Sequence, residues 1–283
     1  MKSINCRGYL LEFDTPKIMG ILNFTPNSFS DGGQFDTSSK ALVQIRKMLD
    51  EGADIIDIGA ISSKPGASLL TLEEEKERLT PLLKAIQKEF QTTIFSLDTF
   101  RSEIAKWAVQ EYNISIINDI SAGELDKNMF KTIGELQVPY IMMHMQGTPA
   151  NMQKNPSYKH VTQDIIQYFA NKINELKSHS IHDIIIDPGF GFGKTLEHNY
   201  QLIEELESFK VLEKLLLVGV SRKSMIQKTL NVDVKNTLNG TSILNTLAVE
   251  KGANILRVHD VKEASEIIQI FNQIKLSSRN STS

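Results

Sequence analysis

The chain has 283 residues, of which 41% are hydrophobic and 23% are charged, and its net charge is −3 at pH 7. This balance is ordinary for a globular protein and excludes a disordered or fibrous chain. The slightly acidic charge argues against a general nucleic-acid coat, so we expect no nucleic-acid partner. A single cysteine, Cys6, excludes an intrachain disulfide and a cysteine-rich zinc site.

The N-terminal stretch lacks the apolar run of a signal peptide. No uncharged apolar segment approaches the ~18 residues needed to span a bilayer. We therefore expect a cytoplasmic protein with no membrane partner. Residues 276–283, which are polar from Ser277 onward, are expected to form a disordered tail.

Short apolar, β-branched runs alternate with longer amphipathic stretches along the chain. Eight such runs are expected to form strands: Lys17–Phe24, Ala53–Gly59, Thr93–Asp98, Ile114–Ile120, Val138–His144, Asp183–Asp187, Leu215–Val220 and Ala253–His259. Most of them are almost continuously hydrophobic, which is typical of parallel strands buried on both faces.

The segments between these runs carry the apolar spacing of helices. In residues 164–176 the apolar stripe recurs every three or four positions, at Ile165, Ile166, Phe169, Ile173 and Leu176. Gly52 and Gly252 end two such segments just before a predicted strand. Pro81 predicts a kink or a separate turn within residues 73–90.

Eight alternations of strand and helix without a flexible linker predict a single (β/α)8 TIM barrel. We expect it to span residues 17–275, preceded by an N-terminal segment, residues 1–16. A doubly wound open sheet is the alternative, because periodicity alone does not prove that eight strands close. No glycine fingerprint follows the first strand, which disfavours the dinucleotide-binding version of that alternative.

A barrel of this kind carries its functional side chains at the C-terminal ends of the strands. Asp98, Asn118 and Asp187 each end a run of buried character, so we expect them to point into the barrel mouth. Asp119 and Asp260 are followed shortly by helical sequence and fit Asx turns or helix caps instead.

Cations cluster after the last two predicted strands, at Arg222, Lys223, Arg257 and His259. Arg257 and His259 lie two positions apart, so they project to the same face of their strand. A guanidinium fork beside an imidazole suits a cluster of anionic oxygens. Lys64 can add a charge from the loop after the second strand. The alternative interpretation is that these cations form surface salt bridges.

The segment D-P-G-F-G-F-G-K-T, residues 187–195, is rich in glycine but fits neither phosphate-loop nor dinucleotide spacing. We interpret it as a tight loop that lets the backbone and Phe190 or Phe192 approach a flat ligand. The six histidines show no metal-binding spacing, and Trp107 lies at helical spacing typical of core packing.

The strand ends carry eight short motifs in order: N-F-T-P-N-S-F-S-D-G-G, S-S-K-P-G-A, D-T-F-R, I-N-D-I-S-A-G, M-H-M-Q-G-T-P, D-P-G-F-G-F-G-K-T, S-R-K-S and R-V-H-D. Together they resemble the motifs of dihydropteroate synthases, over about residues 17 to 265. The resemblance implies a transferase of folate biosynthesis that condenses 6-hydroxymethyl-7,8-dihydropterin pyrophosphate with p-aminobenzoate, giving 7,8-dihydropteroate and pyrophosphate. It also implies Mg²⁺ as cofactor, a homodimer, and competition by sulfonamides for the p-aminobenzoate site.

The same resemblance implies roles for individual residues. Those expected to bind the pterin are Asp98, Asn118, Asp187 and Lys223; those for p-aminobenzoate are Ser63, Pro65, Phe192 and Ser221; those for pyrophosphate are Asn23, Lys64, Arg257 and His259. Asn23 is also expected to bind Mg²⁺, and Lys223, Arg257 and His259 are expected to act in catalysis. Because a dihydropterin supports a cation at its exocyclic methylene, the resemblance fits an SN1-like departure of pyrophosphate.

The loop after the second strand departs from the family pattern. It reads A-I-S-S-K-P-G where many members read G-E-S-T-R-P-G, so Ser63 keeps a hydroxyl and Lys64 loses the arginine fork. Two alternatives stay open. A pterin-dependent methyltransferase shares the barrel and the Asp/Asn floor but leaves S-R-K-S and R-V-H unexplained. A paralogue that binds pterin without synthesis has only the altered loop in its support.

Overall fold

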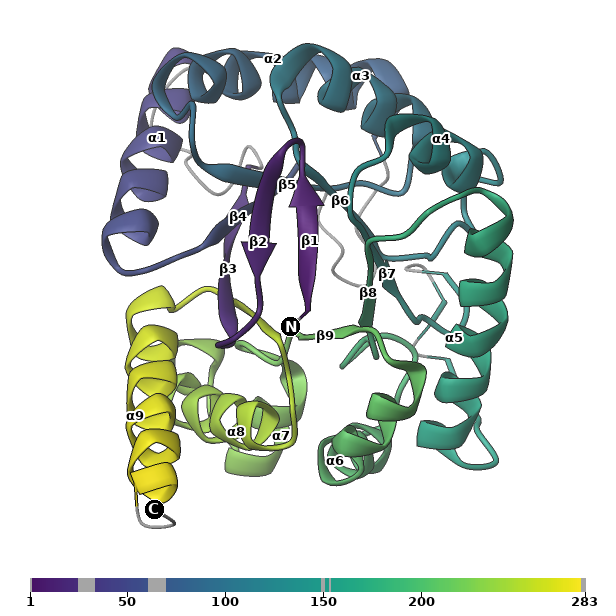
Figure 1. The fold of residues 1–283 in the computed structure, drawn as a ribbon, viewed down its shortest axis with the longest axis vertical. Coiled ribbons are helices and arrows are strands. Elements are labelled where there is room, and N and C mark those ends of the chain that lie inside the picture. Colours follow the sequence, from purple (N-terminus) through teal and green to yellow (C-terminus); the bar gives the residue numbers. More distant parts are fainter. Residues whose placement is uncertain (1, 25–33, 61–69, 149–150, 153, 281–283) are drawn as a thin grey trace.

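The structure is a computed structural model that describes residues 2–24, 34–60, 70–148, 151–152 and 154–280. Eight parallel strands close into a barrel in the order β10-β3-β4-β5-β6-β7-β8-β9 (Figure 1). The predicted (β/α)8 barrel is therefore confirmed, and the open-sheet alternative is wrong.

The barrel strands are β3 (Lys17–Asn23), β4 (Ile55–Gly59), β5 (Ile94–Asp98), β6 (Ile116–Asp119), β7 (Tyr140–Met143), β8 (Ile184–Asp187), β9 (Leu215–Val218) and β10 (Ile255–Val258). Each strand lies inside one of the eight predicted runs. Several runs extend beyond the strand, because the residues that flank it are apolar and buried as well.

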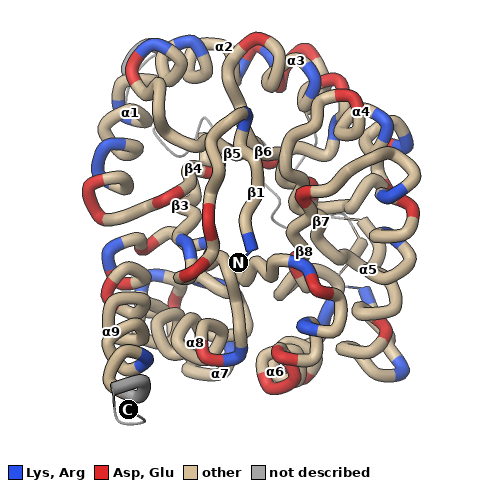
Figure 2. The backbone as a smooth tube through the Cα atoms, in the orientation of Figure 1, with Lys and Arg blue, Asp and Glu red and all other residues tan. Residues whose placement is uncertain are grey.

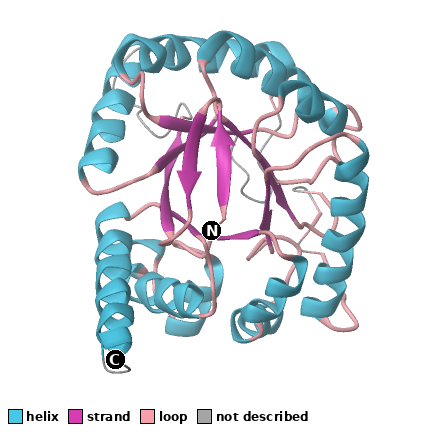
Figure 3. Ribbon diagram, viewed as in Figure 1, coloured by secondary structure: helices cyan, strands magenta, loops and turns pink. Residues whose placement is uncertain are grey.

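Helices surround the barrel strands on the outside (Figure 3). They are α1 (Gln34–Asp50), α2 (Leu72–Glu89), α3 (Ser102–Tyr112), α4 (Met129–Leu136), α5 (Val161–Ser178), α6 (Leu196–Glu204), α7 (Ser224–Leu230), α8 (Leu238–Glu250) and α9 (Val261–Asn280), with short 3-10 helices at Leu206–Leu212 and Val234–Asn236. Helix α2 begins at the Thr71–Glu74 capping box and continues through Pro81, so of the two predicted alternatives, a kink or a separate turn, the separate turn is absent. A proline inside a helix removes a single backbone donor, and the rest of the helix persists on either side.

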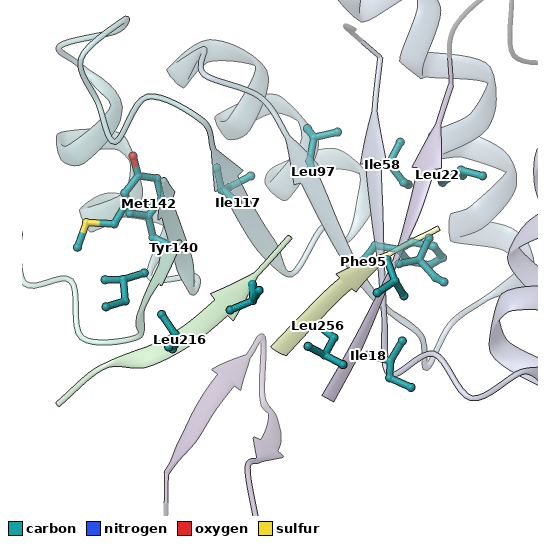
Figure 4. Packing of buried hydrophobic residues seen from close by; sticks show 14 of the residues in the cluster. Ile18, Leu22, Ile58, Phe95, Leu97, Ile117, Tyr140, Met142, Leu216 and Leu256 are labelled. Carbon is teal, nitrogen blue, oxygen red and sulfur yellow. The ribbon is translucent and has the colours of Figure 1, made fainter. Parts of the chain in front are cut away.

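The residues of each barrel strand alternate between an outer and an inner core. The outward set packs under the helices and includes Ile18, Leu22, Ile58, Phe95, Leu97, Ile117, Tyr140, Met142, Leu216 and Leu256 (Figure 4). The inward set fills the N-terminal half of the barrel with Met19, Ile55, Ile94, Ile116, Ile141, Ile185, Leu215, Leu217 and Ile255. The barrel interior is thus packed at one end, which leaves the other end to carry polar groups.

A hairpin of β1 (Ser3–Cys6) and β2 (Tyr9–Glu12) lies across the ring of barrel strands (Figure 1). Its side chains Ile4, Cys6, Leu11 and Phe13 join the inward apolar cluster, and the Asn5 N–H donates to Asp183 Oδ2 at 2.8 Å. The hairpin therefore plugs the N-terminal end of the barrel, where the sequence predicted only an N-terminal segment.

The C-terminal helix is longer than the sequence suggested. Helix α9 continues to Asn280, so the predicted start of a disordered tail at residue 276 is too early, and residues 281–283 lie outside the described part. Charged residues of both signs are spread along the outer helices in the view of Figure 2. None of the described helices combines the length and apolar character that crossing a bilayer requires.

Candidate active site

Inward-facing positions change from apolar to polar toward the C-terminal end of the barrel. On β4 the inward residue Ile55 is followed two positions later by Asp57, and on β5 the inward residues are Ile94, Ser96 and Asp98. The same step brings Asn118, Asp187 and Arg257 inward on β6, β8 and β10. We call the polar residues gathered at this end the mouth cluster: Asn23, Asp57, Asp98, Asn118, Asp187, Ser221, Lys223, Arg257 and His259.

Arg257 joins three strands of the mouth cluster. Its guanidinium lies 2.7 Å from Asp57 Oδ2, and its Nη2 lies 3.0 Å from Asp98 Oδ2. The Asn118 amide donates to the same Asp57 oxygen at 3.1 Å. Strands β4, β5, β6 and β10 thus contribute to one hydrogen-bonded network. The contacts of Arg257 in it are charge-assisted hydrogen bonds, which are stronger than those between neutral groups.

Burial sets the protonation of this network. It raises the pKa of Asp98 to about 7, against the opposing effect of Arg257 and with a further contribution from the charge of Asp57. A carboxyl with a pKa this close to neutrality exchanges its proton in the range where enzymes work. Asp98 can therefore act either as a hydrogen-bond acceptor or, when protonated, as a donor.

Asp187 and Lys223 form the second charged pair of the mouth cluster. Asp187 is buried, and its Oδ1 accepts the Gly189 N–H at 2.8 Å. Burial raises the pKa of Asp187, whereas Gly189 and the charge of Lys223 lower it. Burial also lowers the pKa of Lys223 to about 8, and Asp187 opposes that shift. The Lys223 ammonium lies 4.3 Å from the centre of the Phe192 ring, within cation–π range.

The two phenylalanines of the glycine-rich loop have different surroundings. Phe190 belongs to the outer core under the helices, whereas Phe192 packs with Ile120, Met143 and Met152 at the barrel mouth. Gly191 lies between them at φ +81°, where a side chain would be strained and would approach Lys223. Of the two rings, Phe192 is the one placed beside the mouth cluster.

His259 and Ser221 lie in direct contact. The Ser221 hydroxyl accepts the His259 backbone N–H at 3.2 Å and lies 3.0 Å from His259 Nδ1. Burial lowers the pKa of His259 to about 4, and the nearby arginines Arg222 and Arg257 lower it further. His259 is therefore neutral at pH 7, and a hydroxyl that donates to Nδ1 places the ring hydrogen on Nε2.

Two residues near the mouth cluster have structural partners instead. Arg222 pairs with Asp260, with its Nε 3.1 Å from Oδ2, so this cation is not part of the cluster. Asp119 accepts the Ser121 and Gly123 N–H groups and the Tyr140 hydroxyl, which confirms its interpretation as a turn residue. It faces away from the barrel interior.

Asp57 and Lys194 are buried ionisable residues near the barrel mouth that sequence reasoning missed. Asp57 lies inside an apolar run and not at its end, so it does not stand out in the sequence. The pattern that could have found it is the two-residue spacing of a strand, which places Ile55, Asp57 and Gly59 on one face. Lys194 lies in the glycine-rich loop and donates to the carbonyls of Gly189 and Phe192 at 2.9 and 3.0 Å. Lys194 therefore fixes the shape of that loop from within, and burial lowers its pKa to about 7.

Ser63, Lys64 and Pro65, in the loop after β4, lie outside the described residues. Asn23 ends β3, where it pairs with Gly59, which in turn pairs with Asp98 of β5. Within the described part of the chain, no three histidine, cysteine or carboxylate side chains are grouped to hold a metal ion.

Residues 19–259 match the family described as pterin binding enzyme. The dihydropteroate synthase of Haemophilus influenzae is 43% identical over 92% of this chain and 94% of its own length. Two solved structures superpose closely. The Yersinia pestis dihydropteroate synthase in complex with a sulfonamide drug has a TM-score of 0.90 and 37% identity, over 97% of this chain and 99% of its own. The Xanthomonas albilineans enzyme with 4-aminobenzoic acid has a TM-score of 0.89 and 33% identity, over 96% and 98%.

The chain belongs to the family of pterin binding enzymes. A barrel whose mouth gathers acidic, amide and cationic side chains has the architecture expected of such a protein. Within the family it groups with the dihydropteroate synthases, which are transferases of folate biosynthesis.

Proposed function

We propose that the mouth cluster joins 6-hydroxymethyl-7,8-dihydropterin pyrophosphate to p-aminobenzoate and releases pyrophosphate. The observation that carries this proposal is the single network that links Asp98, Asn118 and Asp57 to Arg257 at one end of the barrel. Acceptors for a heterocycle and donors for an anion thus lie side by side. A substrate that contains both a pterin and a pyrophosphate matches this pairing.

The acidic and amide residues supply the pterin site in this proposal. Asp187 has one oxygen bonded to Gly189 and further lone pairs that can accept the adjacent N–H groups of the amino-pyrimidinone edge. Asn118 donates to Asp57 through its amide, which leaves its carbonyl oxygen to accept. Asp98 accepts from the ring, and Lys223 donates to the ring carbonyl and nitrogen. A buried site of this kind rejects rings that lack these groups, because its own polar atoms would be left unpaired.

The cationic residues supply the pyrophosphate site. Arg257 and the Nε2–H of neutral His259 donate to the phosphate oxygens, and Asn23 and Lys64 add further contacts. These donors stabilise the negative charge that develops as the C–O bond to pyrophosphate breaks, which favours an SN1-like departure. The amine of p-aminobenzoate then attacks the exocyclic carbon and loses its proton. No strong general base is needed for a neutral aniline nitrogen.

The residues present fit Mg²⁺, the metal that the resemblance implies. Mg²⁺ prefers oxygen ligands and commonly binds through one or two protein groups together with substrate phosphates and water. The Asn23 amide oxygen at the end of β3 is such a group. When bound, Mg²⁺ would neutralise charge on the leaving pyrophosphate.

The p-aminobenzoate site that we propose combines Ser63 and Pro65 of the loop after β4 with Phe192 and Ser221. Two of these four residues, Phe192 and Ser221, lie in the described part of the chain, at the barrel mouth. Phe192 lies beside Lys223, and Ser221 contacts His259. Ser221 thus connects the proposed p-aminobenzoate and pyrophosphate sites. Sulfonamides are expected to compete here, and the structure of the Yersinia relative with such a drug supports that expectation.

One assay tests the proposed function. Purified protein is incubated with the pterin pyrophosphate and Mg²⁺, with and without p-aminobenzoate, and released pyrophosphate is measured. Release that depends on p-aminobenzoate is expected. Pterin binding without turnover would support the non-synthetic paralogue, and methyl transfer from methyl-tetrahydrofolate to a corrinoid protein would support the methyltransferase; either result would contradict our proposal.

We also propose that two copies associate. Large apolar side chains are exposed on neighbouring helices, with Ile243 on α8 and Ile270 and Ile274 on α9 each more than half exposed. A surface of this kind is typical of a protein–protein contact. Light scattering coupled to size-exclusion chromatography is expected to give twice the chain mass. The cytoplasmic location expected from the sequence stays a prediction.

A further inference from the structure

Asp57 is the most deeply buried acidic residue of the mouth cluster. It lies in the middle of β4, in register with Ile21 of β3 and Ser96 of β5, and its side chain is fully buried. Both of its hydrogen bonds go to one oxygen: Oδ2 accepts from Arg257 and from Asn118. Its other oxygen, Oδ1, has no hydrogen-bond partner within the described part of the chain.

The contacts of Asp57 connect two halves of the mouth. Asn118 belongs to the proposed pterin site, and Arg257 belongs to the proposed pyrophosphate site. A guanidinium is a planar fork, so two carboxylates on different strands fix the direction of its plane, whereas a single carboxylate leaves it free to swing. Asp57 on β4 and Asp98 on β5 are those two carboxylates.

Asp98 does not suffice for this task on its own. Its pKa of about 7 means that a substantial fraction of Asp98 is protonated at neutral pH, and its proposed role directs it to the pterin ring. Asp57 has no ligand to bind, because it is enclosed by its neighbours. It is therefore the partner of Arg257 that does not change when substrate arrives.

We propose that Asp57 is a positioning residue, which holds the Arg257 guanidinium and the Asn118 amide in one orientation so that the pterin edge and the departing pyrophosphate are bound together. The proposal rests on the proposed function and adds a residue to it. It makes Asp57 a contributor to turnover that acts through Arg257, without contact to substrate.

Asp57→Asn tests the proposal, because the asparagine carbonyl can still accept from Asn118 while the charge that holds Arg257 is lost. We expect kcat to fall at least tenfold, while the Kd for 6-hydroxymethylpterin, which has no pyrophosphate, changes less than threefold. Asp57→Ala removes both contacts and is expected to weaken pterin binding as well. A kcat within twofold of wild type in Asp57→Asn would overturn the proposal.

A double-mutant cycle separates positioning through Arg257 from a general structural role. Arg257→Lys keeps the positive charge but replaces the fork by a point charge, so we expect a loss of kcat similar to that of Asp57→Asn. The combined variant is expected to lose no more than threefold beyond Arg257→Lys alone. If the fold-losses of kcat in the two single variants multiply fully in the double variant, the proposal is overturned. A wild-type kcat in Arg257→Lys would also overturn it, and this test remains available even where Asp57→Asn fails to accumulate as folded protein.

The control is Asp54→Asn. Asp54 precedes the same strand at the opposite end of the barrel, where its Oδ2 accepts the Ile18 N–H and its Oδ1 lies 3.7 Å from Lys17. We expect wild-type kcat and pterin affinity in this variant; a kcat loss equal to that of Asp57→Asn would show a general effect of strand β4 and overturn the proposal. A wild-type protein that releases no pyrophosphate contradicts the proposed function itself, which separates the two failures.

Discussion

Replacing Asp187 by asparagine changes the charge of the mouth cluster while leaving its shape almost unaltered. Asp187 Oδ1 accepts the Gly189 N–H at 2.8 Å, and an asparagine carbonyl can keep that bond. The other oxygen then becomes an NH2 group, which donates hydrogen bonds. It meets the N–H donors of the pterin edge with the wrong polarity, so we expect the bidentate contact to be lost.

The size of the loss follows from the two hydrogen bonds involved. A hydrogen bond to a charged group contributes about 1.5–3 kcal/mol, so two of them contribute roughly 3–6 kcal/mol to pterin binding. At ~1.4 kcal/mol per factor of ten, the Kd is expected to rise by about two to four orders of magnitude. Isothermal titration with 6-hydroxymethylpterin measures this, because a ligand without pyrophosphate reports on the proposed pterin site without the pyrophosphate contacts.

A matched control lies on the same strand segment. Asp183 directly precedes β8 at the opposite end of the barrel, where it accepts the Asn5 N–H of the hairpin. Asp183→Asn is expected to bind pterin within threefold of wild type. An Asp187→Asn protein that melts like wild type and binds pterin within tenfold of it would refute the assignment of Asp187 to the pterin site.

Three further outcomes are expected. The proposed roles need Asp98 ionised and Lys223 protonated, and the pKa values of these groups are about 7 and 8. We therefore expect kcat/KM to rise as the pH increases through 7 and to fall above pH 8. A flat profile between pH 6 and 9 would contradict these roles. Leu11→Ala in the hairpin should lower the free energy of unfolding by about 2–5 kcal/mol in urea melts and leave kcat unchanged; an unchanged stability would show that the plug contributes little. Chelation of Mg²⁺ should stop pyrophosphate release while the pterin Kd stays within twofold, and full turnover in chelator would remove the metal from the mechanism.

The barrel could be predicted from the sequence because its signal is repeated eight times. A strand buried on both faces needs apolar residues at every position, and eight such runs at βα spacing leave few other folds. The hairpin over Ser3–Glu12 gave no comparable signal, since its strands have four residues each. Its apolar side chains acquire a meaning only when the open end of a barrel is present to receive them.

The mouth cluster could be predicted in part for a related reason. Asp98, Asn118 and Asp187 end apolar runs, so the contrast with their neighbours is visible in the sequence alone. Asp57 shows no such contrast, because Ile56 and Ile58 flank it and the strand continues beyond it. Its importance depends on the approach of Arg257, two hundred residues away in the chain, and no local pattern encodes that contact.

Charge balance at the mouth bears on the proposed metal. Within the mouth cluster, the three carboxylates Asp57, Asp98 and Asp187 face the two cations Lys223 and Arg257, while burial keeps His259 neutral. Fully ionised, the mouth cluster carries one net negative charge, and the neighbouring Lys194, whose pKa burial lowers to about 7, only partly offsets it. A site without net positive charge attracts a multiply anionic pyrophosphate poorly. Lys64 and a divalent cation at Asn23, both parts of the proposed pyrophosphate site, would add positive charge for such a ligand. In the proposed mechanism, the carboxylates that accept from the pterin ring are thus also the reason that the leaving group would need additional cations.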